Sequence, residues 1–169
     1  MRKILPILLC AAALFAADGL RRAPGFALFD SKMQVHDLYD YHGKVVVLEF
    51  MLTTCPHCNA FADILHKVRT QYADKVEVLS VVNATADNAG TVSQYAAAHK
   101  VDYPILFDSG QMAYSYIRAM NVDYPHIYVI DGDGMIRGDF TYGVTTRDIF
   151  EGNGIFKEID KILAPGGKK

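Results

Sequence analysis

The chain has 169 residues, of which 51% are hydrophobic and 21% are charged, and its formal net charge is −2. This length predicts one domain with enough apolar side chains for a core, and the apolar fraction excludes a low-complexity disordered chain. Lys and Arg do not outnumber Asp and Glu, so we expect no nucleic-acid partner. The three cysteines, Cys10, Cys55 and Cys58, are too few for a disulfide scaffold.

The first 17 residues, 1–17, have the pattern of a secretory signal peptide. Arg2 and Lys3 precede a short apolar run that ends in small residues. The apolar run is shorter than the roughly 20 residues that span a bilayer. We therefore expect a mature domain over 18–169, exported to the periplasm or another extracytoplasmic compartment, with no stable membrane span. Two alternatives stay open: an uncleaved N-terminal anchor, and a lipoprotein modified at Cys10.

After this segment, apolar runs typical of strands alternate with runs of helical spacing. The β-branched run Lys44–Phe50 predicts a central strand buried on both faces, and Pro56 suits the first position of the helix that follows. The order is that of one α/β domain, which opens with a hairpin. We predict strands over Phe26–Phe29, Val35–Leu38, Lys44–Phe50, Val76–Val82, Pro104–Phe107, Ile127–Ile130 and Met135–Phe140, and helices over Pro56–Tyr72, Thr91–His99, Gln111–Met120 and Thr145–Leu163, the last interrupted at Gly152–Gly154.

Cys55-Pro56-His57-Cys58 lies where the predicted central strand ends and the helix begins. Unpaired backbone N–H groups and the helix dipole favour a thiolate at Cys55, and His57 can add positive charge or a hydrogen bond. A thiolate is the form that attacks disulfides, and Cys58, one helical turn later, can attack the resulting mixed disulfide. We therefore predict a redox-active Cys55–Cys58 pair, with Cys55 as nucleophile, Cys58 as resolving thiol, and Pro56 and His57 tuning the site.

Other uses of this tetrapeptide fit the residues less well. A zinc site lacks a second cysteine pair, and a purely structural disulfide would close a loop too small to constrain the unfolded chain much. A peroxidatic cysteine is disfavoured because Leu52 stands where peroxiredoxins carry Thr. The alternative that stays open is a copper-binding or metallochaperone module that uses Cys55, His57 and Cys58, since soft thiolates suit Cu(I). The redox interpretation needs no cofactor and no metal.

Motifs spread over 23–163 resemble the TlpA/ResA branch of thioredoxin-fold proteins. They are Pro24–Phe26, Gly43–Leu48, the Cys-x-x-Cys pair, Tyr103–Asp108, and Pro125-x-x-Tyr128 continuing to Gly134. The resemblance implies an α/β thioredoxin fold, a central mixed sheet flanked by helices, with an N-terminal hairpin extension. It also implies extracytoplasmic thiol–disulfide exchange with protein thiols or disulfides, including a redox partner protein, and we expect a monomer. The Cys-Pro-His-Cys segment instead resembles the oxidising DsbA branch, so the direction of electron flow stays open.

The resemblance also assigns residues around the cysteines. Pro125 matches the cis-proline loop, which packs against the cysteine pair and binds substrate backbone. Tyr124 and His126 would then flank the substrate groove. Thr53 and Thr54 stand where the family usually has Trp before the first cysteine, which makes this surface more polar.

Glu49 lies six residues before Cys55, where thioredoxin has a buried Asp. Burial would raise the pKa of this carboxyl and allow it to take the proton from Cys58 during exchange. A solvated or hydrogen-bonded glutamate at the end of a strand is the alternative.

Overall fold

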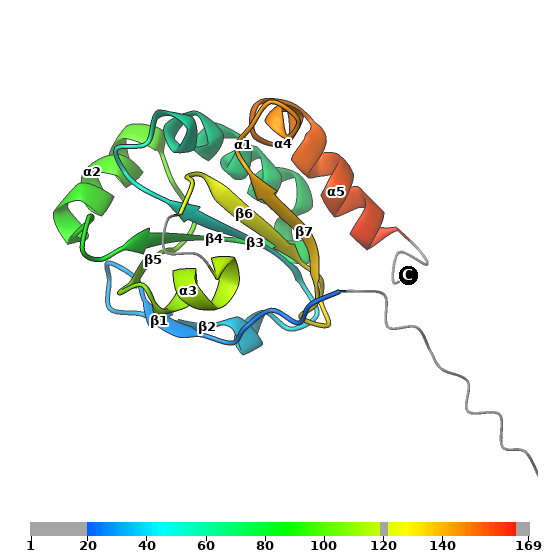
Figure 1. The fold of residues 1–169 in the computed structure, drawn as a ribbon, viewed down its shortest axis with the longest axis horizontal. Helices are drawn as coiled ribbons and strands as arrows, with labels where there is room; N and C mark the ends of the chain where they lie inside the picture. The colour runs from blue at the N-terminus through cyan, green and yellow to red at the C-terminus, as the bar shows by residue number, and fades with distance from the viewer. Residues whose placement is uncertain (1–19, 119–121, 165–169) are drawn as a thin grey trace, which may run out of the picture.

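The structure, a computed structural model, describes residues 20–118 and 122–164, so the expected signal peptide lies outside the described residues (Figure 1). Its centre is a five-stranded sheet with the strand order β5-β4-β3-β6-β7. Strands β3, β4 and β5 run parallel to one another. Strand β6 is antiparallel to β3, and β7 is antiparallel to β6. The predicted mixed α/β sheet is therefore confirmed. The strands are β3 (Val45–Met51), β4 (Val76–Asn83), β5 (Ile105–Asp108), β6 (His126–Ile130) and β7 (Ile136–Thr141).

Helices cover both faces of the sheet, which explains why every residue of β3 is buried. Figure 1 shows α1, α2, α4 and α5 on one face, and α3 on the other. Because side chains alternate along a strand, Val45, Val47 and Met51 meet the α1 face, whereas Val46 and Phe50 meet the α3 face. The helices are α1 (Pro56–Tyr72), α2 (Ala89–His99), α3 (Gln111–Ile117), α4 (Arg147–Glu151) and α5 (Gly154–Leu163).

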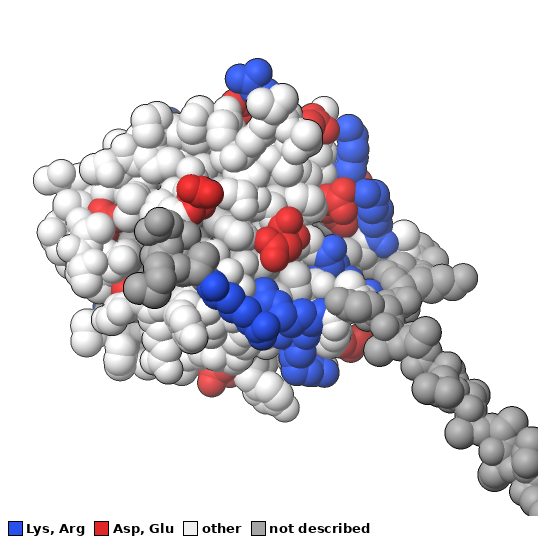
Figure 2. All heavy atoms as spheres, in the orientation of Figure 1, with Lys and Arg blue, Asp and Glu red and all other residues white. Residues whose placement is uncertain are grey.

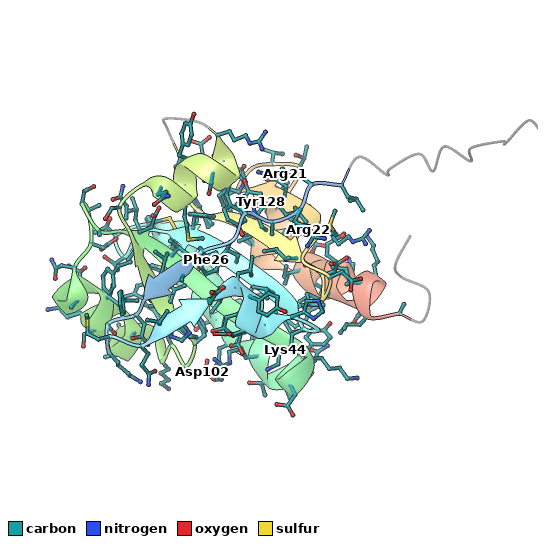
Figure 3. All side chains as sticks on the ribbon, turned by 90° about the horizontal axis from the view of Figure 1, so that it is seen from below. Arg21, Arg22, Phe26, Lys44, Asp102 and Tyr128 are labelled. Atoms are coloured by element: carbon teal, nitrogen blue, oxygen red, sulfur yellow. A yellow bond between two sulfur atoms is a disulfide. The ribbon has the colours of Figure 1, made fainter. Side chains whose placement is uncertain are left out.

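The N-terminal hairpin is confirmed as a separate two-stranded sheet of β1 (Ala27–Phe29) and β2 (Val35–Asp37). The segment before it is fastened to α3. Arg21 donates to the carbonyl oxygens of Ser115 and Tyr116 at 3.2 and 2.8 Å, and its guanidinium lies 5.7 Å from the ring centroid of Tyr128 (Figure 3). Figure 2 shows basic side chains gathered near this segment, with acidic side chains beside them.

Three helix ends differ from the predicted ones, and the last predicted helix begins at Arg147 rather than Thr145. Helix α2 begins at Ala89 rather than Thr91, because the Asn88 side chain accepts hydrogen bonds from the next amides and caps the helix. Helix α3 ends at Ile117, because Arg118 adopts a left-handed conformation with φ of 57°, and the predicted end at Met120 lies outside the described residues. The expected interruption at Gly152–Gly154 is confirmed and divides the last helix into α4 and α5.

Glycine is required where α5 begins. A Cβ built on Gly154 would lie 2.7 Å from the backbone nitrogen of Ile149. The close approach of α5 to α4 therefore leaves no room for a side chain at this position.

Candidate active site

The two cysteines lie at the start of α1 and form a disulfide, as predicted. Cys55 is the N-cap residue of α1, and its sulfur accepts a hydrogen bond from the Cys58 amide at 3.2 Å. The Cα atoms of the two cysteines are 5.3 Å apart. Cys55 is half-buried and Cys58 is fully buried. A partner can therefore reach the Cys55 sulfur but not the buried Cys58 sulfur.

The loop before the cysteines is held by a buried carboxylate that the sequence motifs did not reveal. Asp87, between β4 and α2, accepts hydrogen bonds from the Thr53 amide at 3.2 Å and from the Thr53 hydroxyl. The hydroxyl of Thr91 in α2 also donates to Asp87, at 3.0 Å. Thr53 therefore ties the loop before the cysteines to α2 through Asp87. The only sequence feature that could have indicated this contact is the position of Asp87 directly before Asn88, the N-cap of α2.

Glu49 of β3 is fully buried, as expected. Burial raises its pKa to about 7, and a hydrogen bond from Ser80 opposes that rise. Ser80 is the partner of Glu49 in the β3–β4 ladder, and its hydroxyl donates to Glu49 Oε2. Oε1 has no hydrogen-bond partner among the described residues. Glu49 lies on the same face of β3 as Met51, which packs in the cluster that contains Cys58.

Two tyrosines stand close to this buried carboxylate. The Tyr95 hydroxyl of α2 donates to the carbonyl oxygen of Cys58 at 3.3 Å. The Tyr103 hydroxyl is buried and has no hydrogen-bond partner within the described part of the chain. The negative charge of Glu49 raises the pKa of both phenols further, after the larger effect of burial. Both tyrosines therefore remain neutral over the physiological pH range.

The Tyr124–Pro125 peptide bond is cis, as expected, whereas the predicted role of Pro125 in binding substrate backbone stays a prediction. Tyr124 is partly buried and packs against the cluster that contains Cys58 and Cys55. His126 has a different environment. Its side chain is buried, its Nε2 lies 2.7 Å from Asp139 Oδ1, and its ring stacks on Tyr128 with centroids 4.8 Å apart.

His126 pairs with Phe50 in the sheet and shares its face, opposite to Glu49. Its predicted place beside a substrate groove stays a prediction.

His57 is exposed and stacks on Tyr142, the first residue after β7. The ring centroids are 3.8 Å apart and the planes differ by 19°. The amide of Tyr142 also donates to the carbonyl oxygen of Pro125 at 3.2 Å. Tyr142 therefore touches both the Cys-Pro-His-Cys turn and the cis-proline loop. No local sequence pattern predicts this contact, because 85 positions separate the two rings.

One further observation bears on the copper alternative. Within the described ranges, no group of three or more His, Cys, Asp or Glu side chains is placed to hold a metal ion. Cys55 and Cys58 are instead bonded to each other, so the copper alternative gains no support. In the same ranges, no helix has both the length and the apolar character needed to cross a membrane.

Comparison with known proteins agrees with this geometry. The AhpC/TSA family model matches residues 20–138. The thioredoxin-like protein YneN of Bacillus subtilis is 31% identical over 133 residues, which cover 78% of this chain and 75% of YneN. Thiol-disulfide oxidoreductase ResA of Geobacillus kaustophilus is also 31% identical, over 75% of this chain and 71% of ResA.

A solved structure gives the same fold. The thioredoxin domain of a thiol-disulfide oxidoreductase from Bacteroides vulgatus superposes with a TM-score of 0.68 at 22% identity, covering 82% of this chain and 96% of that domain. The Cys55–Cys58 disulfide and the matched relatives together support thiol–disulfide redox chemistry. The chain belongs to the AhpC/TSA family and has the thioredoxin fold.

Proposed function

We propose that this protein is an extracytoplasmic thiol–disulfide oxidoreductase that acts on protein thiols or disulfides through Cys55 and Cys58. The observation that carries the proposal is the unequal exposure of two bonded sulfurs at a helix N-terminus. Cys55 is reachable, and its sulfur accepts a backbone N–H, whereas Cys58 is buried one turn later. A partly exposed thiol at such a position is stabilised as thiolate and can attack a partner.

The exchange takes place in two steps. In the reductive direction, the Cys55 thiolate attacks one sulfur of a partner disulfide, the partner's S–S bond breaks, and a Cys55–partner disulfide forms with release of one partner thiolate. Cys58 then loses its proton and attacks the Cys55 sulfur. The Cys55–Cys58 disulfide forms and the second partner thiolate leaves. Two electrons pass from the chain to the partner, and the reverse sequence oxidises a partner dithiol.

Glu49 is the proposed acceptor for the proton of Cys58. With a pKa of about 7, the Glu49 carboxyl is protonated in about half of the molecules at neutral pH. This suits a group that takes up and returns a proton. Its Oε1 has no partner among the described residues and is free to receive that proton. Because Glu49 and Cys58 are both fully buried, bulk water is a poor acceptor for this thiol.

The groove for the partner is proposed to lie along Pro125 and Tyr124. Tyr124 and Cys55 both pack against the cluster that contains Cys58, and the Pro125 carbonyl oxygen accepts a hydrogen bond from the Tyr142 amide. A partner segment at this place would lie next to the half-buried Cys55. The extracytoplasmic location rests on the sequence pattern of 1–17, and protein disulfides persist in such compartments.

Trapping the mixed disulfide tests the proposal. Reduced Cys58→Ser protein mixed with insulin, a disulfide-bonded probe, is expected to accumulate a covalent adduct at Cys55. Matched Cys55→Ser protein is expected to form no adduct and to lose catalysis of insulin reduction. If Cys55→Ser retains catalysis, or if the adduct forms equally well on Cys58, the assigned roles are wrong. Export is tested by expressing the full-length chain in a bacterium and identifying the protein by mass in the periplasmic fraction. A protein found only in the cytoplasm would contradict the extracytoplasmic location.

A further inference from the structure

Tyr142 joins three parts of the site. Its ring lies parallel to His57, its amide donates to the Pro125 carbonyl oxygen, and its ring edge meets Phe150 of α4 with centroids 5.6 Å apart and an interplanar angle of 60°. Phe150 in turn packs on Phe61 of α1 at 5.1 Å. The tyrosine ring is thus fixed by buried neighbours on one side and presents a flat face to His57 on the other.

The hydroxyl end of Tyr142 is fixed as well. It donates to Oε1 of Glu151, and Oε2 of the same carboxylate pairs with Arg147 Nε at 2.9 Å. The hydrogen bond to Glu151 raises the pKa of the Tyr142 phenol, so the ring remains a neutral donor. A phenol that donates to a carboxylate has a more electron-rich ring. That ring therefore offers a more negative face to a cation.

His57 has no comparable anchor of its own. Its side chain is exposed, and within residues 20–118 and 122–164 its imidazole makes no hydrogen bond or ion pair. The stack on Tyr142, with centroids 3.8 Å apart, lies well inside the roughly 6 Å at which an aromatic face attracts a cation. Glu151 and Arg147, at the hydroxyl end of Tyr142, both belong to α4 and pair with each other.

We infer that Tyr142 is a positioning residue for the cysteine couple, holding the His57 ring against the turn that carries Cys55 and thereby favouring the reduced form. The inference rests on the proposed function. A positive imidazolium two residues from Cys55 stabilises the Cys55 thiolate of the reduced chain, and the disulfide of the oxidised chain carries no charge to stabilise. Loss of the stack should therefore shift the couple toward the disulfide and make it less oxidising.

The test is a double-mutant cycle on the glutathione equilibrium. The reaction is protein disulfide plus two glutathione thiols giving protein dithiol plus glutathione disulfide, read by mass after alkylation. Tyr142→Leu should shift this equilibrium about two- to fivefold toward the protein disulfide, the range of an exposed cation–π contact. Tyr142→Phe, which keeps the ring, should recover most of the wild-type value. In a His57→Ala background, Tyr142→Leu should cause no shift.

Two results of the cycle would overturn the inference: no shift with Tyr142→Leu, or an equal shift in the absence of His57. The second result would mean that Tyr142 acts through α4 and the fold. A wild-type NMR measurement does not depend on whether the variants fold. The His57 ring protons should show an upfield ring-current shift and cross-relaxation to Tyr142, and their absence contradicts the stack. Failure of the proposed function would give a different result, because neither the wild type nor any variant would then reach a thiol–disulfide equilibrium with glutathione.

Discussion

Replacing Glu49 by Gln tests the buried carboxyl on which the proposed proton transfer depends. Burial raises the pKa of Glu49 from 4.5 to about 7. Between these two values the folded chain binds more protons than the unfolded chain, so the free energy of unfolding decreases as the pH rises. At 1.36 kcal/mol per pKa unit, the loss amounts to about 3 kcal/mol once the pH is above 7. The amide side chain of the Glu49→Gln variant does not titrate, so the variant should escape this loss.

Urea unfolding of the oxidised protein at a series of pH values measures the effect. The unfolding free energy of Glu49→Gln minus that of wild type should increase by up to about 3 kcal/mol from about pH 4.5 to about pH 8. Taking the difference cancels the titration of groups that both proteins share. Glu158→Gln, which removes a partly exposed carboxylate paired with Lys161, is the matched control and should give a nearly constant difference. A constant difference for Glu49→Gln as well would refute the raised pKa.

Three further changes test the framework around the cysteines. Phe61→Ala empties a fully buried position on α1 and should cost about 3–5 kcal/mol in urea unfolding; a loss below about 1 kcal/mol would contradict its place in the core. Asp87→Ala leaves the Thr53 amide without its acceptor and should cost about 1–3 kcal/mol, with faster hydrogen exchange at that amide; unchanged exchange would contradict the tie. Gly154→Ala forces a methyl against the Ile149 backbone and should lower stability by about 1–3 kcal/mol in the same assay; a neutral effect would show that α4 and α5 can separate.

Features encoded by neighbouring residues could be predicted from the sequence. Helix α1 runs over Pro56–Tyr72 as predicted, because its apolar spacing is regular and proline occupies the first position. The cysteine pair and the buried environment of Glu49 follow from the same strand-to-helix connection. Helix α2 starts two residues before its predicted start because Asn88 belongs to a polar run that resembles a loop, yet acts as a cap.

Contacts between distant segments could not be predicted. The bond from Thr53 to Asp87 spans 34 positions, and the stack of His57 on Tyr142 spans 85. Each contact depends on where the whole sheet places two loops. The residues next to Thr53 and His57 in the sequence form no pattern that would predict either partner. The face on which His126 lies likewise follows from its register with Phe50, which the sequence alone does not specify.

The central claim is that Cys55 and Cys58 form one two-electron couple. Equilibrating the protein over a range of glutathione redox potentials, then alkylating free thiols and measuring the mass, tests it directly. We expect each chain to have both cysteines alkylated or both protected, in a single transition that Cys55→Ser abolishes. A midpoint of about −120 mV would make the protein an oxidant, and one of about −270 mV a reductant. Chains that carry a single label across the transition would show that the two cysteines react independently and do not form one couple.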